Sequence, residues 1–168
     1  MQLIADLHLH SRYARACSKA ITIKNLEKYS KLKGLNLLGT GDFTHPLWLK
    51  ELKQELKEDD SGILKTKSGT QFVLQTEVAN FFRHGNKPRK VHNIILAKNF
   101  ETVSQINELF SKHGKLQSDG RPMFASYPCV DMVEDLMEID KSIEIIPAHI
   151  LTPYFGVLGS KSGFNSLE

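Results

Sequence analysis

The stretch "TQFVLQTEVANFFRHGNKPRKVHNIILA", Thr70–Ala97, decides the fold of this chain. It begins with an apolar strand, Thr70–Val78, and ends with another, Val91–Ala97. The Gly85–Asn86 pair between them indicates a turn, so the segment predicts a β-hairpin.

The hairpin brings two chemically capable side chains together. A turn centred between His84 and Gly85 would place Glu77 directly opposite His92. A carboxylate and an imidazole on facing strands can bind one metal ion together.

Outward from the hairpin, strands and helices alternate along the chain. Hydrophobic periodicity, Thr22 as an N-cap, Pro46 at a helix start and Gly34 as a stop mark the boundaries. We expect strands at 2–9, 35–43 and 143–150, and helices at 22–34, 45–60, 101–114 and 131–140. This alternation is typical of an α/β fold with a parallel sheet or barrel.

Composition excludes some classes of protein. The 168 residues suit one domain, and a net charge of +3 permits a nucleic acid partner without requiring one. The two cysteines form no C-x-x-C pair, which favours an intracellular, cytoplasmic setting over a disulfide framework. We expect no membrane partner, because no apolar run approaches the roughly 20 residues of a span. We also expect no signal peptide, because "MQLIAD" before the histidines is too short and lacks a basic start.

Histidines and acids gather where the expected strands end. In "DLHLH", alternate residues share a face of the strand, so Asp6, His8 and His10 project together. The expected metal ligands are His8, His10, Asp42, Glu77, His92 and His149. Six ligands exceed the three or four of one zinc ion, so two or three divalent ions are expected: zinc first, with manganese or magnesium as alternatives.

Each of these residues alone is more often a cap or a solvated loop residue, and only the set argues for a metal centre. We assign His8 and His10 to one ion and His92 and His149 to a second, with Glu77 bridging them. Asp42 would hold a third ion or a water, and Asp6 and His45 would orient ligand side chains. The residues expected to take part in catalysis are Glu77, Asp42 and His8.

Basic residues near the expected centre are candidates for contacts with phosphate. They follow the first histidines, crowd the tip of the hairpin and recur in a glycine-rich loop near the end of the chain. These candidates are Arg12, Arg15, Arg83, Lys87, Arg89, Lys90 and Lys161. Solvated surface charge is the alternative reading for all of them.

Five motifs carry a family resemblance. In order, "DLHLHS", "TGDFTH", "QTEV", "VHNIIL" and "PAHI" resemble the motifs of the PHP (polymerase and histidinol phosphatase) phosphoesterases. That resemblance implies a distorted TIM-like (PHP) barrel of seven strands, of which this chain would supply about five, and a cluster of metal ions. This chain differs from most PHP proteins at Asp42, where they have a histidine.

Two longer stretches, 11–52 and 147–168, resemble the endonuclease Q family. The resemblance implies a metal-dependent DNA endonuclease that acts in DNA repair, nicking 5′ of deaminated bases (uracil, hypoxanthine, xanthine) or abasic sites. It also implies a sliding clamp as a partner, a late Asp-x-His pair, and C-terminal zinc and helical regions.

The late Asp-x-His pair and the C-terminal zinc and helical regions do not lie within residues 1–168. We therefore expect the chain to be the N-terminal portion of a PHP domain, without the rest of the barrel, and inactive or weak alone. Two alternatives stay open: a phosphomonoesterase like histidinol phosphatase, and a PHP module without catalytic activity. The basic hairpin favours the endonuclease.

Overall fold

The predicted hairpin forms the long central part of the sheet. In the computed structural model, which describes residues 2–167, β4 (Gln71–His84) and β5 (Lys87–Ala97) pair antiparallel along their length. Gly85 turns the chain between them with a φ of 57°, a conformation that favours glycine. Residues 74–80 of β4 are all buried, so this strand is covered on both faces.

A curled, mixed sheet is built on this hairpin. Its main path runs β1-β2-β4-β5-β7, and β3 and β6 also pair with β4. The added strands are short: β1 (Ala5–Asp6), β2 (Leu37–Gly39), β3 (Leu64–Lys65), β6 (Met123–Ala125) and β7 (Glu144–Pro147). The pairs β1–β2, β2–β4 and β4–β6 are parallel, whereas β3–β4, β4–β5 and β5–β7 are antiparallel.

The parallel sheet expected from the alternation is confirmed only in part: three of these pairs are parallel, and three, including the predicted hairpin, are antiparallel. The two-residue connection at Gly85 can only return the chain antiparallel, since a parallel pair needs a long crossover. The mixed α/β class itself is confirmed.

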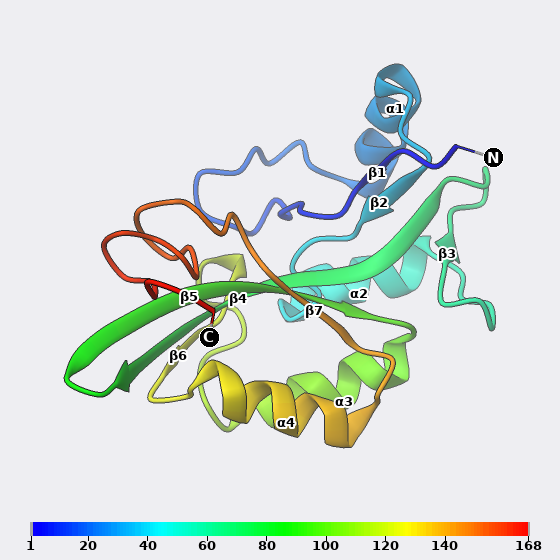
Figure 1. Cartoon of the computed structure of the whole chain (residues 1–168). Coiled ribbons are helices and arrows are strands. Elements are labelled where there is room, and N and C mark those ends of the chain that lie inside the picture. The colour runs from blue at the N-terminus through cyan, green and yellow to red at the C-terminus, as the bar shows by residue number, and fades with distance from the viewer. Residues whose placement is uncertain (1, 168) are drawn as a thin grey trace.

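Within residues 2–167, four helices pack around the sheet. They are α1 (Ile23–Lys33), α2 (Pro46–Glu55), α3 (Phe100–Ser111) and α4 (Cys129–Ile139), with a 3₁₀ turn, η1 (Ser118–Gly120), between the last two. Figure 1 shows α3 and α4 side by side below the β4–β5 hairpin, and α1 beside β1 and β2. Within the described part of the chain, no helix has the length and apolarity to cross a membrane.

Helix starts match the sequence signals. The hydroxyl of Thr22 accepts a hydrogen bond from the amide of Asn25, as an N-cap should, and Gly34 ends α1 with a left-handed φ of 70°. The expected helix over 45–60 ends early, at Glu55, because the next residues turn into a bridge between Lys57 and Lys65.

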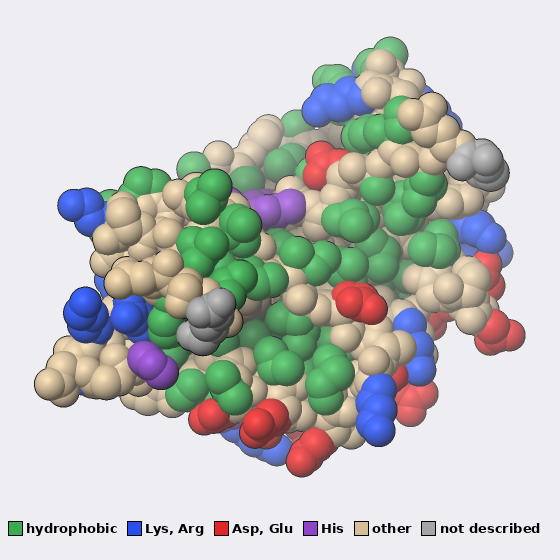
Figure 2. Space-filling model, in the orientation of Figure 1, with side chains coloured by type: hydrophobic (Ala, Val, Ile, Leu, Met, Phe, Trp, Pro, Cys, Tyr) green, Lys and Arg blue, Asp and Glu red, His purple; other side chains and the backbone are tan. Residues whose placement is uncertain are grey.

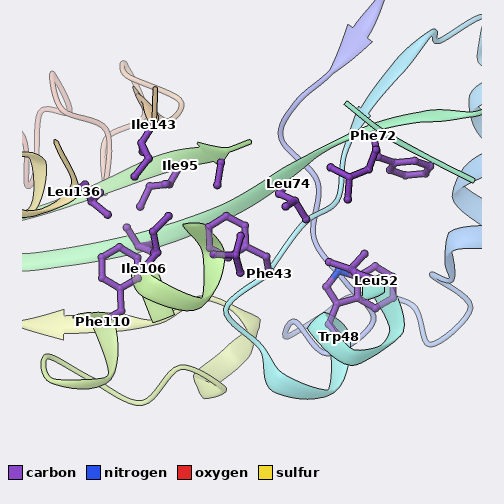
Figure 3. Close-up of a cluster of buried hydrophobic side chains, with 14 of the residues drawn as sticks. Phe43, Trp48, Leu52, Phe72, Leu74, Ile95, Ile106, Phe110, Leu136 and Ile143 are labelled. Atoms are coloured by element: carbon purple, nitrogen blue, oxygen red, sulfur yellow. The ribbon is translucent and has the colours of Figure 1, made fainter. Parts of the chain in front are cut away.

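The hydrophobic core follows the sheet on its helical side. Figure 3 shows Phe110, Ile106 and Leu136 near the hairpin and Trp48 and Leu52 on α2, with Phe43 and Leu74 between the two groups. The buried indole of Trp48 donates to the carbonyl oxygens of Thr40 and Gly41 at 3.0 and 2.9 Å. This bond anchors α2 to the loop that follows β2.

Candidate metal centre

A fully buried carboxylate, Glu77 on β4, is the focus of the site. Four imidazole nitrogens surround it, and they come from three separate parts of the chain. The contacts of Glu77 Oε1 are His92 Nδ1 at 3.0 Å, His149 Nε2 at 3.3 Å and His8 Nε2 at 3.4 Å; Oε2 lies 3.2 Å from His10 Nε2. Figure 2 shows histidine side chains gathered near the middle of one face of the molecule.

These side chains form two groups of three that share Glu77. One is His8, His10 and Glu77, and the other is Glu77, His92 and His149. Within each group the ligand atoms lie within 4.8 Å of one another, a space of the size of a metal ion. The predicted division of the histidines between two ions, with Glu77 common to both, matches this geometry.

The donor atoms suit a divalent cation. Oε1 of Glu77 is buried and has no hydrogen-bond partner, although three ring nitrogens lie within 3.4 Å of it. A buried carboxylate oxygen without a donor needs a compensating group. Imidazole and carboxylate are the ligands of zinc and manganese sites, so the residues fit such an ion.

His8 and His10 lie in an extended segment just after β1, beyond the last paired residue. The buried side chain of Gln75 holds this segment: its Oε1 accepts from the amides of Leu9 at 3.0 Å and Gly41 at 3.1 Å. The predicted strand over 2–9 is therefore too long. The two histidines still converge, with ring centroids 5.5 Å apart.

His92 and His149 contact Oε1 of Glu77, the oxygen that His8 also contacts. Ala148 donates its amide to the carbonyl of His92 at 2.9 Å, which continues the β5–β7 pairing up to the site. Nδ1 of His149 lies 2.8 Å from the hydroxyl of Thr152, and that hydroxyl lies 2.8 Å from the carbonyl oxygen of Tyr154. If Thr152 donates to that carbonyl, it accepts from Nδ1–H, which leaves the lone pair of His149 on Nε2, 3.2 Å from Nδ1 of His92.

Asp42 lies behind His10 and belongs to neither group of three. Its Oδ1 is 2.9 Å from Nδ1 of His10, and its Oδ2 accepts from the amide of Ser11 at 2.6 Å. Both oxygens of this fully buried carboxylate are therefore engaged within the chain. The geometry suits a partner that orients His10 better than it suits a ligand.

The charges of the site reinforce one another. Burial alone would raise the pKa of Glu77, but the ring nitrogens of His10, His8 and His92 beside its oxygens hold it far below its usual range. The hydrogen bonds to Asp42 and Glu77 raise the pKa of His10 to about 9, and burial lowers the pKa of His92.

One residue at the centre has no counterpart among the predicted ligands. Arg121, between η1 and β6, donates from Nη1 to Oε2 of Glu77 at 2.8 Å. In the sequence it is an ordinary arginine in "SDGRPM", and no periodicity or spacing marks it.

Two residues expected to orient ligands make other contacts. Asp6 accepts from the backbone amide of His8 at 3.3 Å. His45 is the N-cap residue of α2, without a side-chain cap bond, and its ring stacks on Tyr13 with centroids 4.4 Å apart.

The candidate phosphate contacts divide into engaged and exposed side chains. Arg12 pairs with Glu51 at 2.5 Å. Arg89 donates to the carbonyl of Gly163 and lies over the ring of Phe164, 4.4 Å from its centroid, and so ties the hairpin to the final loop. The exposed candidates are Arg15, Arg83, Lys87, Lys90 and Lys161.

Known proteins were found to be similar to this chain in sequence and in structure. No family model matches the chain. An uncharacterized protein of Methanocaldococcus jannaschii is 33% identical over 149 residues, which are 88% of this chain and 16% of that protein.

Two solved structures share the fold. One is the lesion-specific endonuclease PfuEndoQ of Pyrococcus furiosus, with a TM-score of 0.82 and 32% identity over 98% of this chain and 38% of that one. The other is endonuclease Q in complex with a 27-mer duplex that has an abasic lesion at the active site, with a TM-score of 0.81 and 33% identity. The second match covers 97% of this chain and 38% of the endonuclease Q chain.

This chain thus spans less than half the length of each of these relatives. Nearly all of it is similar in sequence and fold to one part of a lesion-specific DNA endonuclease, endonuclease Q.

Proposed function

We propose that this chain carries the metal centre of a DNA endonuclease that nicks 5′ of deaminated bases or abasic sites in DNA repair. The observation that carries the proposal is the buried Glu77 ringed by His8, His10, His92 and His149 in a fold similar to endonuclease Q. The sheet would then belong to a PHP barrel, with residues 1–168 as its N-terminal portion.

The residues that would hold the ions are His8 and His10 for one, His92 and His149 for the other, and Glu77 for both. Two divalent ions bound there would supply an activated water and would neutralise charge on the phosphodiester oxygens. Zinc fits this donor set, and manganese or magnesium would serve the same chemistry.

The rest of the site orients these ligands. Asp42 holds the Nδ1 side of His10, and the hydroxyl of Thr152 holds the Nδ1 side of His149. In both rings the opposite nitrogen, Nε2, points to Glu77. Partners of this kind set the tautomer of a ligand histidine and raise its basicity.

Substrate selection would rest on the phosphate backbone and on the damaged nucleotide. The exposed basic residues of the hairpin and the final loop would contact phosphates, which position the duplex without reading its sequence. Reaching a base inside a duplex requires unstacking it, which costs a few kcal/mol and least for a damaged or mispaired base. A lesion therefore favours access to the centre.

The test uses the complete gene product that contains these 168 residues, because the chain spans 38% of the endonuclease Q chains and is expected to be weak alone. A duplex with one uracil or abasic site, end-labelled, is incubated with the protein and Mn²⁺, beside the undamaged duplex. We expect one nick, 5′ of the lesion.

His8→Ala and Glu77→Gln should abolish this nicking, and Glu101→Gln, on the exposed start of α3, should leave it unchanged. Variants at His8 and Glu77 that nick as fast as the natural protein would remove these residues from the chemistry. Equal cleavage of damaged and undamaged strands would replace lesion recognition with a general phosphoesterase activity.

A further inference from the structure

Arg121 lies at the metal centre, yet the ligand chemistry does not use it. Its Nη1 is 2.8 Å from Oε2 of Glu77, and its Nη2 is 3.8 Å from Oδ2 of Asp119. The side chain is 29% exposed, so part of the guanidinium faces solvent at the edge of the site.

The backbone just after Arg121 is held by β4. The amide of Ala79 donates to the carbonyl of Pro122 at 2.9 Å, where β6 begins to pair with β4 two residues beyond Glu77. This pairing sets the distance between Arg121 and Glu77 along the sheet.

The turn before Arg121 is locked as well. Asp119 and Gly120 both have a positive φ, 58° and 66°, and a Cβ at Gly120 would lie 2.8 Å from the Cα of Ala14. The carboxylate of Asp119 accepts the backbone amide of Arg15 at 2.9 Å. The turn is thus packed tightly on the segment that follows His10, and it fixes where the arginine starts.

The present partner of Arg121 is also the carboxylate that cations would occupy. Divalent ions on both sides of Glu77 would compete for its oxygens and would repel the guanidinium. An anion that lies between them would relieve that repulsion. A guanidinium has five N–H donors in a planar fork that matches the oxygens of a phosphate.

We propose that Arg121 is a phosphate-binding residue, and that it turns from Glu77 to the phosphate group held at the centre once the ions are bound. The inference rests on the proposed function, since it assigns a further contact within the same site. Without metal, Arg121 is an ion-pair partner of Glu77. With metal, it binds the phosphate group of the substrate.

The test measures the binding of inorganic phosphate to the full 168-residue chain by calorimetry, with and without saturating Mn²⁺. We expect binding only with Mn²⁺, and Arg121→Gln should weaken it by about 10-fold or more, the usual effect of losing a charged hydrogen bond. Arg121→Lys should fall between the two, since it keeps the charge and loses the fork. Lys33→Gln, which removes one charge from the last turn of α1, should bind as the natural chain does.

A purely structural ion pair predicts another result: Arg121→Gln would change thermal stability or Mn²⁺ affinity and would leave phosphate affinity at saturating Mn²⁺ untouched. That outcome, or a natural chain that binds no phosphate with Mn²⁺, overturns the inference. If Arg121→Gln does not fold, the Nε–H NMR resonance of Arg121 in the natural chain with Zn²⁺ decides. A shift on adding phosphate supports the contact, and an unmoved resonance rejects it.

Duplex DNA separates this inference from the proposed function. If Arg121 binds phosphate but the complete gene product nicks damaged and undamaged duplexes alike, lesion recognition fails and the inference stands. If nicking is lesion-specific and Arg121→Gln binds phosphate normally, the inference fails alone.

Discussion

At the scale of single residues, the site is built around one buried negative charge. Glu77 is fully buried, and a carboxylate in such a place is tolerated only when it is paired and hydrogen-bonded. Four imidazoles and the guanidinium of Arg121 lie within 3.4 Å of its oxygens. This concentration of donors around one carboxylate explains why its pKa is so low.

Replacing Glu77 tests this role directly. Glu77→Gln removes the charge common to both groups of ligands, so the affinity for Zn²⁺ or Mn²⁺ should fall by more than about 100-fold, beyond the typical effect of losing a supporting residue. Isothermal titration of metal into the purified chain measures it. Glu101→Gln is the matched control, and equal affinity in the two variants would show that the ions bind elsewhere.

Replacing Asp42 should lower the metal affinity less than replacing Glu77 does. Asp42→Asn keeps the shape of the side chain that contacts His10 and Ser11 but loses its charge, so metal affinity should fall by about 10- to 100-fold. Asp60→Asn, on an exposed loop, should change nothing. A loss as large as that of Glu77→Gln would make Asp42 a ligand in its own right.

At the scale of elements, the hairpin shows what sequence reasoning could and could not reach. The turn at Gly85 and the two strands follow from local signals, and they are confirmed. The predicted register is wrong by two residues: Glu77 pairs with Ile94, and His92 pairs with Ala79. An even shift keeps each side chain on its face, so His92 still reaches Glu77, diagonally.

Other features of the site depend on contacts that are distant in sequence. The position of His8 and His10 rests on Gln75, 66 residues beyond Leu9, and not on strand pairing of their own. Arg121 reaches Glu77 from 44 residues away, through a β6 of only three residues. No local pattern could predict either contact, because neither leaves a period or a motif in the chain.

The turn before Arg121 makes a specific prediction. Gly120→Ala should destabilise the fold by about 1–3 kcal/mol more than Gly34→Ala, because a Cβ at Gly120 meets the backbone of Ala14 whereas one at Gly34 meets nothing within 4 Å. The two glycines have φ values of 66° and 70°, so the backbone penalty cancels in the comparison. Urea denaturation of both variants measures the difference, and equal losses would show that the turn yields.

Helix α4 is fixed by a buried phenol with a pH signature. Tyr127 donates to Asp135 at 2.6 Å; burial, and then this carboxylate, raise the pKa of Tyr127 well above its ordinary value of 10.0. The phenol therefore ionises first in the unfolded chain, so its contribution to stability is complete below pH 10 and declines as the pH rises further.

Tyr127→Phe should remove part of the loss of unfolding free energy above pH 10, whereas Tyr29→Phe, on the exposed face of α1, should not. Urea denaturation between pH 8 and pH 11 tests this. An alkaline decline as steep in Tyr127→Phe as in the natural chain would mean that other groups cause it.

At the scale of the whole molecule, the centre joins parts of the chain that are far apart. His8 and His10 come from the first segment, Glu77 and His92 from the long hairpin, and His149 from the segment after β7. Because no local segment contains all the ligands, the centre exists only when the sheet has formed. Metal binding and folding should therefore be linked, since a ligand that binds only the folded chain stabilises it.

The central claim is that these five side chains form one centre for two ions, and anomalous diffraction tests it most directly. A crystal of the chain soaked in saturating Mn²⁺ should show two anomalous peaks, one between His8, His10 and Glu77 and one between Glu77, His92 and His149. Peaks away from Glu77, or no peak at either position at saturating Mn²⁺, would contradict the account.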